Sequence, residues 1–408
     1  MRRATGVFMI FFAFAVPWEY SLDVGEPLGN VARIAGVLML LAAIPAALRS
    51  LGGTGLRRPG PLQWLALGYF LYFALTYFWT VDQEVTQEKL RGFFQEIMIV
   101  WIIWEFARTA EDLRWFFRAF VAGCLLLAIL TIGNFTSASG IAAEQIRFVA
   151  EGQDPNDVAR FLDLGFPLAA LLFVTEARLL LRVLALAYLP AGLMAVLLTA
   201  SRGGLSTAVV AMIGSAILLV AWRPRAGTAV LLGLATCAGL AALLVPEGSL
   251  ERLATIPEQL GSSDLNERVN IWTSGWKAFV HAPWFGSGAG TFTIAAGLAP
   301  FDSAHNTVVS LMVTGGLVAV SLLGAIAAVS AIAVVRTPGV VRIALGTVLA
   351  VLCLTSNVGT VEENRATWLI FALCVLAGRI AGEDPTALPR AFPAGEPAHL
   401  GKLKPSFR

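Results

Sequence analysis

The sequence predicts an all-α membrane protein with about twelve transmembrane helices. Of its 408 residues, 57% are hydrophobic and only 14% are charged. Apolar runs of about seventeen residues or more recur along the chain, and this is the length that a helix needs to cross the hydrocarbon core of a bilayer. A soluble fold could not bury so much apolar surface.

Hydropathy along the chain gives the approximate position of each span. We place the spans near residues 5–22, 31–48, 62–79, 92–107, 115–134, 158–175, 179–199, 203–222, 226–245, 306–333, 339–357 and 365–381. The first span follows two arginines like a signal peptide, but Glu19 and Asp23 follow it in place of a small-residue cleavage site. We therefore expect it to be a transmembrane helix. Glu96 and Glu105 interrupt the fourth span.

The distribution of basic residues predicts the orientation, because lysine and arginine are retained on the cytoplasmic side during insertion. An even number of spans places both termini on one side. Most of the 29 basic residues fall on that side, whereas most of the 27 acidic residues do not. The basic residues on it are Arg2, Arg3, Arg49, Arg57, Arg58, Arg108, Arg114, Arg118, Arg178, Arg182, Arg223, Arg225, Arg336, Arg342, Arg379, Arg390, Lys402, Lys404 and Arg408. Both termini are therefore predicted to be cytoplasmic.

This orientation divides the chain into four segments. Residues 1–245 would hold the first nine spans and residues 306–381 the last three. Between them, residues 246–305 would form one large periplasmic loop. Residues 382–408 are rich in proline and short of apolar periodicity, and we expect a disordered cytoplasmic tail there. Long loops commonly carry function, so the periplasmic side is where we look for a site.

The large loop contains a predicted amphipathic helix. Apolar residues recur there at spacings of 4, 3, 4 and 3, with Asp264 as the expected N-cap. They are Leu265, Val269, Trp272, Trp276 and Phe279. Tryptophans on one face suit the headgroup boundary, so we expect this helix to lie along the membrane surface, with Arg268 at the edge of the stripe.

Three further features lie on the same predicted side. The connection between the seventh and eighth spans holds Arg202 beside a pair of glycines, and glycine lets a ligand approach the backbone closely. His305 and Asn306 come directly before the tenth span, after a glycine-rich run at 284–292. An Asp-Pro-Asn segment at 154–156 precedes the sixth span.

Each of these residues also has a structural interpretation. An arginine at a membrane boundary usually anchors the chain to lipid phosphates. Arg202 differs from that pattern, because it lies where basic residues are scarce and in a connection too short to need an anchor. A single histidine at a helix start is more often a cap or a packing residue than a base.

Several classes of function are disfavoured. The net charge of +2 gives no indication of a nucleic-acid partner. The glycine-rich run follows no strand and has no accompanying Walker lysine, which disfavours a nucleotide site. All four cysteines lie inside apolar runs, so we expect neither a disulfide nor a metal site. They are Cys124, Cys237, Cys353 and Cys374. We predict no cofactor.

The order of the motifs resembles the signature region of O-antigen ligases and Wzy-type polymerases. SRGG is followed by an arginine four residues before a tryptophan, then by P-W-F-G-x-G, and then by His-Asn opening an apolar helix. The resemblance covers roughly residues 199–320, and the segments at 154–156 and 357–368 are also similar. Members of this family transfer a glycan from an undecaprenyl-pyrophosphate carrier to a sugar acceptor, on the periplasmic face of the bacterial inner membrane.

The resemblance implies roles for three residues. Arg202 and Arg268 would clamp the pyrophosphate in place of a divalent metal, since guanidinium groups bind phosphate oxygens in a bidentate manner. His305 would be the base that takes the proton of the acceptor hydroxyl. A single displacement would invert the anomeric centre. Asp302 and Glu362 stay open as residues that could form a covalent intermediate.

Four further residues have weaker predicted roles in substrate binding. Lys89, Arg91 and Arg160 lie on the same predicted side and would contact phosphates of the carrier or of the acceptor, although membrane anchoring explains them equally well. Asn306 would orient His305.

Three alternatives stay open. Ligases use lipid A-core as the acceptor, whereas polymerases use another lipid-linked repeat unit. The single long loop favours a ligase, but the loop at 134–157 is itself sizeable, so a polymerase of O-antigen or exopolysaccharide is the next candidate. A transporter or flippase of lipid-linked sugars is a rival from another class, and it would place charges near the bilayer midplane. A non-catalytic scaffold of a secretion complex is a second such rival.

Overall fold

The described part of the chain is helical, as predicted. The computed structural model describes residues 2–25, 29–52, 55–138, 146–255 and 268–389. Its longer helices are α1 (Arg2–Ala15), continued by a 3-10 turn at Val16–Ser21, α2 (Val31–Leu51), α3 (Pro61–Thr76), α4 (Gln83–Phe106), α5 (Ala110–Ser137), α6 (Pro155–Thr175), α7 (Leu179–Leu198), α8 (Arg202–Trp222), α9 (Pro224–Ala242), α14 (Thr307–Val335), α15 (Gly339–Thr355) and α16 (Arg365–Glu383). Each predicted span overlaps one of them.

Eight of the described helices are long and apolar enough to cross a membrane. They are α1 with its 3-10 turn, α2, α5, α6, α7, α8, α14 and α16, whereas α9 and α15 are shorter apolar helices. The chain is therefore a multi-pass membrane protein, and a total of twelve crossings stays a prediction.

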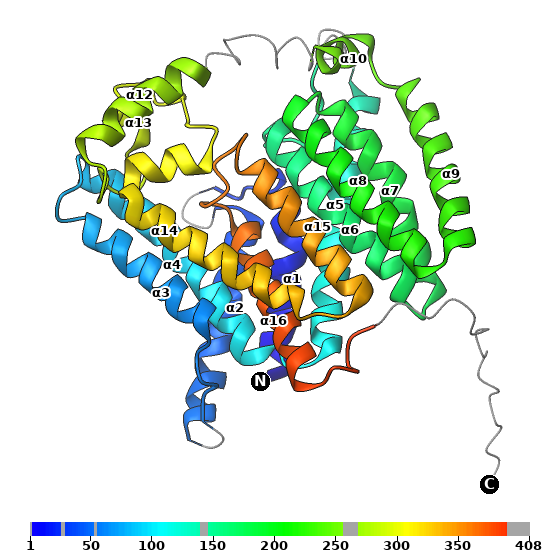
Figure 1. Ribbon diagram of the computed structural model, residues 1–408, viewed down its shortest axis with the longest axis horizontal. Coiled ribbons are helices and arrows are strands. Elements are labelled where there is room, and N and C mark those ends of the chain that lie inside the picture. The colour runs from blue at the N-terminus through cyan, green and yellow to red at the C-terminus, as the bar shows by residue number, and fades with distance from the viewer. Residues whose placement is uncertain (1, 26–28, 53–54, 139–145, 256–267, 390–408) are drawn as a thin grey trace.

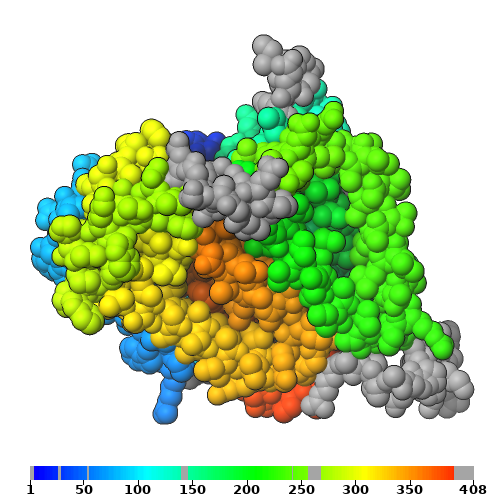
Figure 2. Space-filling model, turned by 45° about the horizontal axis from the view of Figure 1, so that its top comes forward, coloured from blue at the N-terminus to red at the C-terminus, as the bar shows by residue number. Residues whose placement is uncertain are grey.

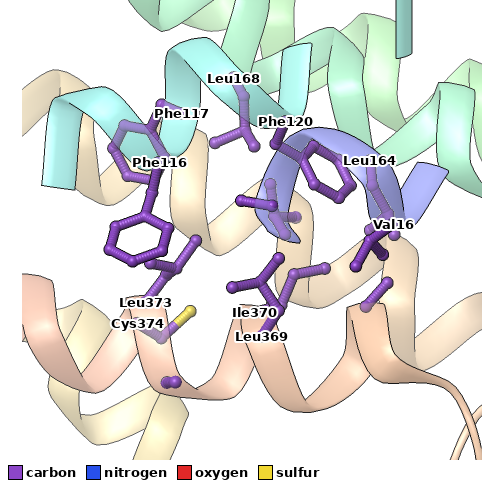
Figure 3. Packing of buried hydrophobic residues seen from close by; sticks show 14 of the residues in the cluster. Val16, Phe116, Phe117, Phe120, Leu164, Leu168, Leu369, Ile370, Leu373 and Cys374 are labelled. Carbon is purple, nitrogen blue, oxygen red and sulfur yellow. The ribbon is translucent and has the colours of Figure 1, made fainter. Parts of the chain in front are cut away.

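Helices α6 and α16 form the centre of the bundle. The most apolar stretches of α6 and α16 are 89% and 83% buried inside the protein, respectively. Figure 3 shows phenylalanines of α5 packed against leucines of α6 and α16. The labelled residues of this packing are Val16, Phe116, Phe117, Phe120, Leu164, Leu168, Leu369, Ile370, Leu373 and Cys374. Because lipid is as apolar as these side chains, close packing holds such helices together.

Helix α14 is broken at Gly316, and the glycine-rich run fills the break. Gly316 has φ +62° and ψ −164°, a conformation that is essentially restricted to glycine. The amide of Gly288 donates to the carbonyl oxygen of Thr314, and the amide of Leu317 donates to that of Pro283, both at 2.9 Å. The backbone groups freed by the break are thus satisfied by a neighbouring segment, as membrane proteins require. The glycine-rich run has a structural role here.

Among its described residues, the predicted large loop contains three short helices, α10 (Glu247–Ala254), α12 (Arg268–His281) and α13 (Phe292–Ala295). Figure 1 shows α10 and α12 at one end of the bundle, with the start of α1 at the opposite end. This places the described part of the loop over the ends of the long helices, away from the N-terminal end of α1.

A helix, α12, is present in this region as predicted, but its buried face differs from the predicted one. The buried residues are Ile271, Gly275 and Phe279, whereas Trp276 is 57% exposed. Gly275 accounts for the shift, because its missing side chain lets Phe292 approach the helix. The expected N-cap Asp264 and first stripe residue Leu265 lie outside the described residues.

The segment after α16 differs from the expected disordered tail in its first residues. Leu388 is buried against the main core, only a few residues after α16 ends. The rest of the tail, residues 390–408, lies outside the described residues.

Candidate functional site

A cavity of about 880 Å³ lies at the end of the bundle that carries α10 and α12. It brings together Arg202, Arg268 and His305, three residues that are far apart in the sequence. Other residues that line it are Arg147, Asp154, Asn156, Ser201, Arg252, Trp272, Phe301, Asp302 and Asn357. The walls come from the starts of α6 and α8, from α10 and α12, and from the segments before α14 and after α15.

Arg202 is the first residue of α8. Ser201 caps this helix by accepting a hydrogen bond from the amide of Gly204, as serine commonly does at helix starts. The Arg202 guanidinium donates to the hydroxyl of Thr255 at 3.0 Å, which points it across the cavity towards α10. The N-terminal end of a helix carries partial positive charge, so α8 adds to the attraction for anions.

Two arginines that the sequence did not single out hold the turn before α8. Arg147 donates to the carbonyl oxygen of Thr199 at 3.0 Å, and Arg252 donates to that of Ala200 at 3.2 Å. Ala200 has φ +46°, a strained value for a residue other than glycine. Arg147 also donates to the side-chain oxygen of Asn156 at 3.2 Å. The Asp-Pro-Asn and SRGG motifs therefore meet in one hydrogen-bonded unit.

The four guanidinium groups of the cavity make no ion pair with a carboxylate among the described residues. Burial, and then the charge of Arg252, lower the pKa of Arg147, and burial lowers that of Arg268. Arginine stays charged despite such shifts. Asp154 and Asp302 also line the cavity, but four arginines exceed the charge of two carboxylates. A bound anion such as a pyrophosphate would balance this excess.

His305 lies in this cavity in a strained conformation. Its φ is +47°, and strain of this kind in a residue other than glycine is often found at functional sites. The hydroxyl of Ser303 lies 3.3 Å from its Nε2 atom and 3.4 Å from its Nδ1 atom. Burial, and then the charge of Arg268, lower the pKa of His305. The imidazole is therefore neutral at neutral pH, as a base must be.

Asn306, which the sequence analysis expects to orient His305, caps the helix that follows it. Its side chain caps α14 by accepting a hydrogen bond from the amide of Val309 at 3.0 Å. Its amide group donates to the carbonyl oxygen of Asn357 at 3.4 Å. The next residue, Thr307, donates to the carbonyl oxygen of Gly359 at 3.1 Å. The start of α14 is thus held by the connection between α15 and α16.

The other predicted binding residues do not line this cavity. Lys89 forms an ion pair with Glu363 at 2.6 Å and lies in a separate cavity of about 360 Å³. Arg160 is buried in α6, where it forms an ion pair with Asp157 at 3.0 Å. Arg91 is exposed on α4. Their predicted contacts with substrate phosphates gain no support from the geometry of the site.

Of the two carboxylates that could form a covalent intermediate, only one lines the cavity. Asp302 lines the cavity, and its side chain accepts a hydrogen bond from the amide of Ala299 at 3.3 Å. Glu362 is 1% exposed and is not among the lining residues. Burial, and then the charge of Glu363, raise the pKa of Glu362 to about 8. Glu362 is therefore protonated at neutral pH and does not line the cavity that holds the arginines.

The helical bundle and this cavity define a multi-pass membrane protein with a strongly cationic site at one end. Residues 185–324 match the family described as O-Antigen ligase. This match confirms the resemblance that the motifs of residues 199–320 indicated. The match includes Arg202, Arg252, Arg268 and His305. In a comparison with curated proteins, none matches the chain.

Proposed function

We propose that the protein transfers a glycan from an undecaprenyl-pyrophosphate carrier to a sugar acceptor on the periplasmic face of the inner membrane. The observation that carries this proposal is the pairing of four arginines, free of carboxylate partners among the described residues, with a histidine held neutral in the same cavity. The family match over residues 185–324 supports lipid-linked glycans as the class of substrate.

The arginines account for the leaving group. In the reaction, the bond between the anomeric carbon and the pyrophosphate oxygen breaks, and the electron pair leaves with that oxygen. Arg202 and Arg268 face the cavity, where they would contact the pyrophosphate and stabilise this developing charge. Arg147 and Arg252 hold the turn that positions Arg202 and add their own charge.

His305 accounts for the activation of the acceptor. A hydroxyl oxygen of the acceptor forms the new bond to the anomeric carbon while its proton passes to the neutral imidazole. The charge of Arg268 disfavours the imidazolium that results, so the proton is readily released to solvent. One displacement of this kind inverts the anomeric centre. The guanidinium groups supply the positive charge that the step needs, so we expect activity without a divalent metal.

Among the members of this family, we favour a ligase with lipid A-core as the acceptor, because the sequence predicts one long periplasmic loop. The test uses purified protein in proteoliposomes with an undecaprenyl-pyrophosphate-linked oligosaccharide, lipid A-core and EDTA. Glycan attached to lipid A-core supports the ligase, whereas only longer lipid-linked chains would show a polymerase. No transferred glycan, together with movement of the lipid-linked sugar across the bilayer, would overturn the proposal in favour of a transporter.

A further inference from the structure

A cavity of about 440 Å³ lies between the C-terminal halves of α2 and α4, beside the connection that leads to α3. We call it the α2–α4 cavity. The hydroxyl of Thr5, near the start of α1, donates to the carbonyl oxygen of Ala42 on α2 at 3.1 Å, so this is the end of the bundle where α1 begins. Figure 1 shows the end of α2 projecting away from α10 and α12, and in Figure 2 this projection is the blue segment at the lower edge. The predicted orientation places it in the cytoplasmic leaflet.

The wall that α2 contributes to the α2–α4 cavity is apolar and open to lipid. Leu40, Ile44 and Ala47 line it at spacings of four and three, which keeps them on one helix face. From residue 40 to residue 47 the helix rises about 10 Å. The most apolar stretch of α2 is only 33% buried, and Ile44 is 48% exposed. An acyl chain of the bilayer therefore has direct access to this wall.

Two arginines line the mouth of the same cavity. Arg58 is exposed, and its guanidinium makes no hydrogen bond or ion pair among the described residues. The guanidinium of Arg57 donates to the carbonyl oxygen of Trp104 at 3.1 Å, which holds it against α4. Burial, and then the charge of Arg108, lower the pKa of Arg57. One guanidinium is thus fixed at the mouth, and the other is available to a ligand.

The carboxylates near this mouth are already engaged. Glu105 lines the cavity, but it is 8% exposed, forms an ion pair with Arg108 at 3.1 Å and accepts a hydrogen bond from the backbone amide of Arg57 at 2.8 Å. Arg379 of α16 also donates to the end of α4, and it forms an ion pair with Glu383 at 3.6 Å. The four arginines around the cavity exceed the charge of these two carboxylates. An anionic ligand would balance the excess.

We infer that the α2–α4 cavity binds an anionic glycerophospholipid of the bilayer, with its phosphate at Arg57 and Arg58 and one acyl chain along α2. Basic pockets between transmembrane helices on the cytoplasmic side suit anionic lipid headgroups, which are attracted to arginine and lysine there. A zwitterionic lipid would bring its own cation to the arginines. This inference is independent of glycan transfer, which we place at the other end of the bundle.

Two other occupants fit the α2–α4 cavity less well. In a two-fold dimer the same patch meets itself, so the arginines of one copy would oppose those of the other. Two concave surfaces would also leave a void between them, whereas protein interfaces are closely packed. A soluble phosphate would reach the arginines but would leave the apolar wall without a partner. A lipid satisfies both parts of the cavity.

Native mass spectrometry of the protein in mild detergent tests the site, with phosphatidylglycerol and phosphatidylethanolamine added in equal amounts. The two lipids share the glycerol phosphate and the acyl chains but differ in net charge. We expect wild type to retain phosphatidylglycerol at least about fivefold more than phosphatidylethanolamine. Equal retention of the two lipids would overturn the inference, and so would a lipid-free dimer.

Two pairs of variants locate the bound lipid. Arg58→Gln removes the available guanidinium, and its control is Arg49→Gln, at an exposed arginine of α2 that does not line the cavity. Ile44→Trp fills the apolar wall, and Leu48→Trp makes a change of the same size at a residue that is 63% exposed and outside the lining. We expect Arg58→Gln and Ile44→Trp to lower retention of phosphatidylglycerol about fivefold or more, with both controls unchanged. Equal losses within the arginine pair would contradict the site.

A competition with glycerol 3-phosphate separates the lipid from its headgroup. Excess glycerol 3-phosphate should leave phosphatidylglycerol bound, because the soluble group lacks the acyl chain that contacts α2. Displacement of the lipid would overturn the inference in favour of a site for soluble phosphates. If Ile44→Trp failed to fold, Arg58→Gln would still decide the outcome, since the Arg58 side chain has no hydrogen bond or ion pair to lose among the described residues.

Discussion

The indole N–H of Trp272 donates a hydrogen bond to the carbonyl oxygen of Ala304 at 2.8 Å. Ala304 directly precedes His305, and Trp272 lies one turn after Arg268 on α12. This bond therefore links the helix that carries one arginine of the site to the segment that carries the proposed base. Ala304 is buried, so its carbonyl oxygen has little access to water as a substitute partner.

Removing this bond should impair turnover. In Trp272→Phe the aromatic ring stays but the donor is lost, and we expect kcat to fall about tenfold, because small displacements of a catalytic group are costly. Trp276→Phe is the matched control, since Trp276 is on the same helix and exposed. The measurement is steady-state glycan transfer by both variants. Equal rates for the two would show that the bond does not position His305.

The pH dependence of transfer should report the environment of His305. Because its pKa is lowered, the neutral base persists below the ordinary histidine pKa of about 6.5, and kcat/KM should fall only at lower pH. Arg268→Gln removes one cause of the lowering, so the acid limb should move to higher pH. Arg202→Gln is the control, because the charge of Arg202 is not among the causes of the shift. Profiles of kcat/KM that shift equally in both variants would contradict this assignment.

Position 316, where α14 is broken, should not tolerate a side chain. In Gly316→Ala the new Cβ would lie 2.4 Å from the backbone of Trp284, at a φ that disfavours alanine. We expect a loss of about 2 kcal/mol or more in the free energy of unfolding. In the same helix, Gly324→Ala meets no atom within 4 Å and should leave stability unchanged or raise it. Thermal unfolding followed by circular dichroism compares them, and equal Tm values would refute the role of Gly316.

The turn before α8 should depend on the shape of Arg147 as well as on its charge. Arg147→Lys keeps the charge, but one ammonium cannot reproduce the forked bonds to Thr199 and Asn156. We expect a loss of about 1 to 3 kcal/mol in stability, the cost of a buried acceptor left unpaired. Arg91→Lys makes the same change at an exposed position and should have no effect. Unfolding of the two variants by heat or denaturant distinguishes these outcomes.

Hydropathy predicted the helices well, because it depends on local sequence. Asp154, Ser201 and Asn306 each begin a helix by accepting backbone amides, which their residue types favour. The buried face of α12 was predicted less well. Its periodicity fitted Trp276 as well as Ile271, and the choice depended on Phe292, a residue of another helix that packs on Gly275.

The site was predicted only in part, for a similar reason. Arg202, Arg268 and His305 stood out by their motifs, and the structure places all three in one cavity. Arg147 and Arg252 have no motif around them. Neither belongs to the basic residues predicted to be cytoplasmic, and this predicted periplasmic position could have indicated a role for them. Their hydrogen bonds to the turn at 199–200 depend on how α6, α8 and α10 pack together, which a single sequence does not reveal.

The most direct test of the account separates donor binding from turnover in reconstituted protein. It compares His305→Ala, Arg202→Ala and Arg268→Ala with Lys277→Ala, an exposed residue of α12 outside the cavity. We predict that the two arginine variants lose binding of undecaprenyl pyrophosphate, whereas His305→Ala keeps binding but transfers no glycan, and Lys277→Ala keeps both. If the folded arginine variants bound the carrier as wild type does, or if His305→Ala still transferred glycan, the proposed mechanism would be wrong.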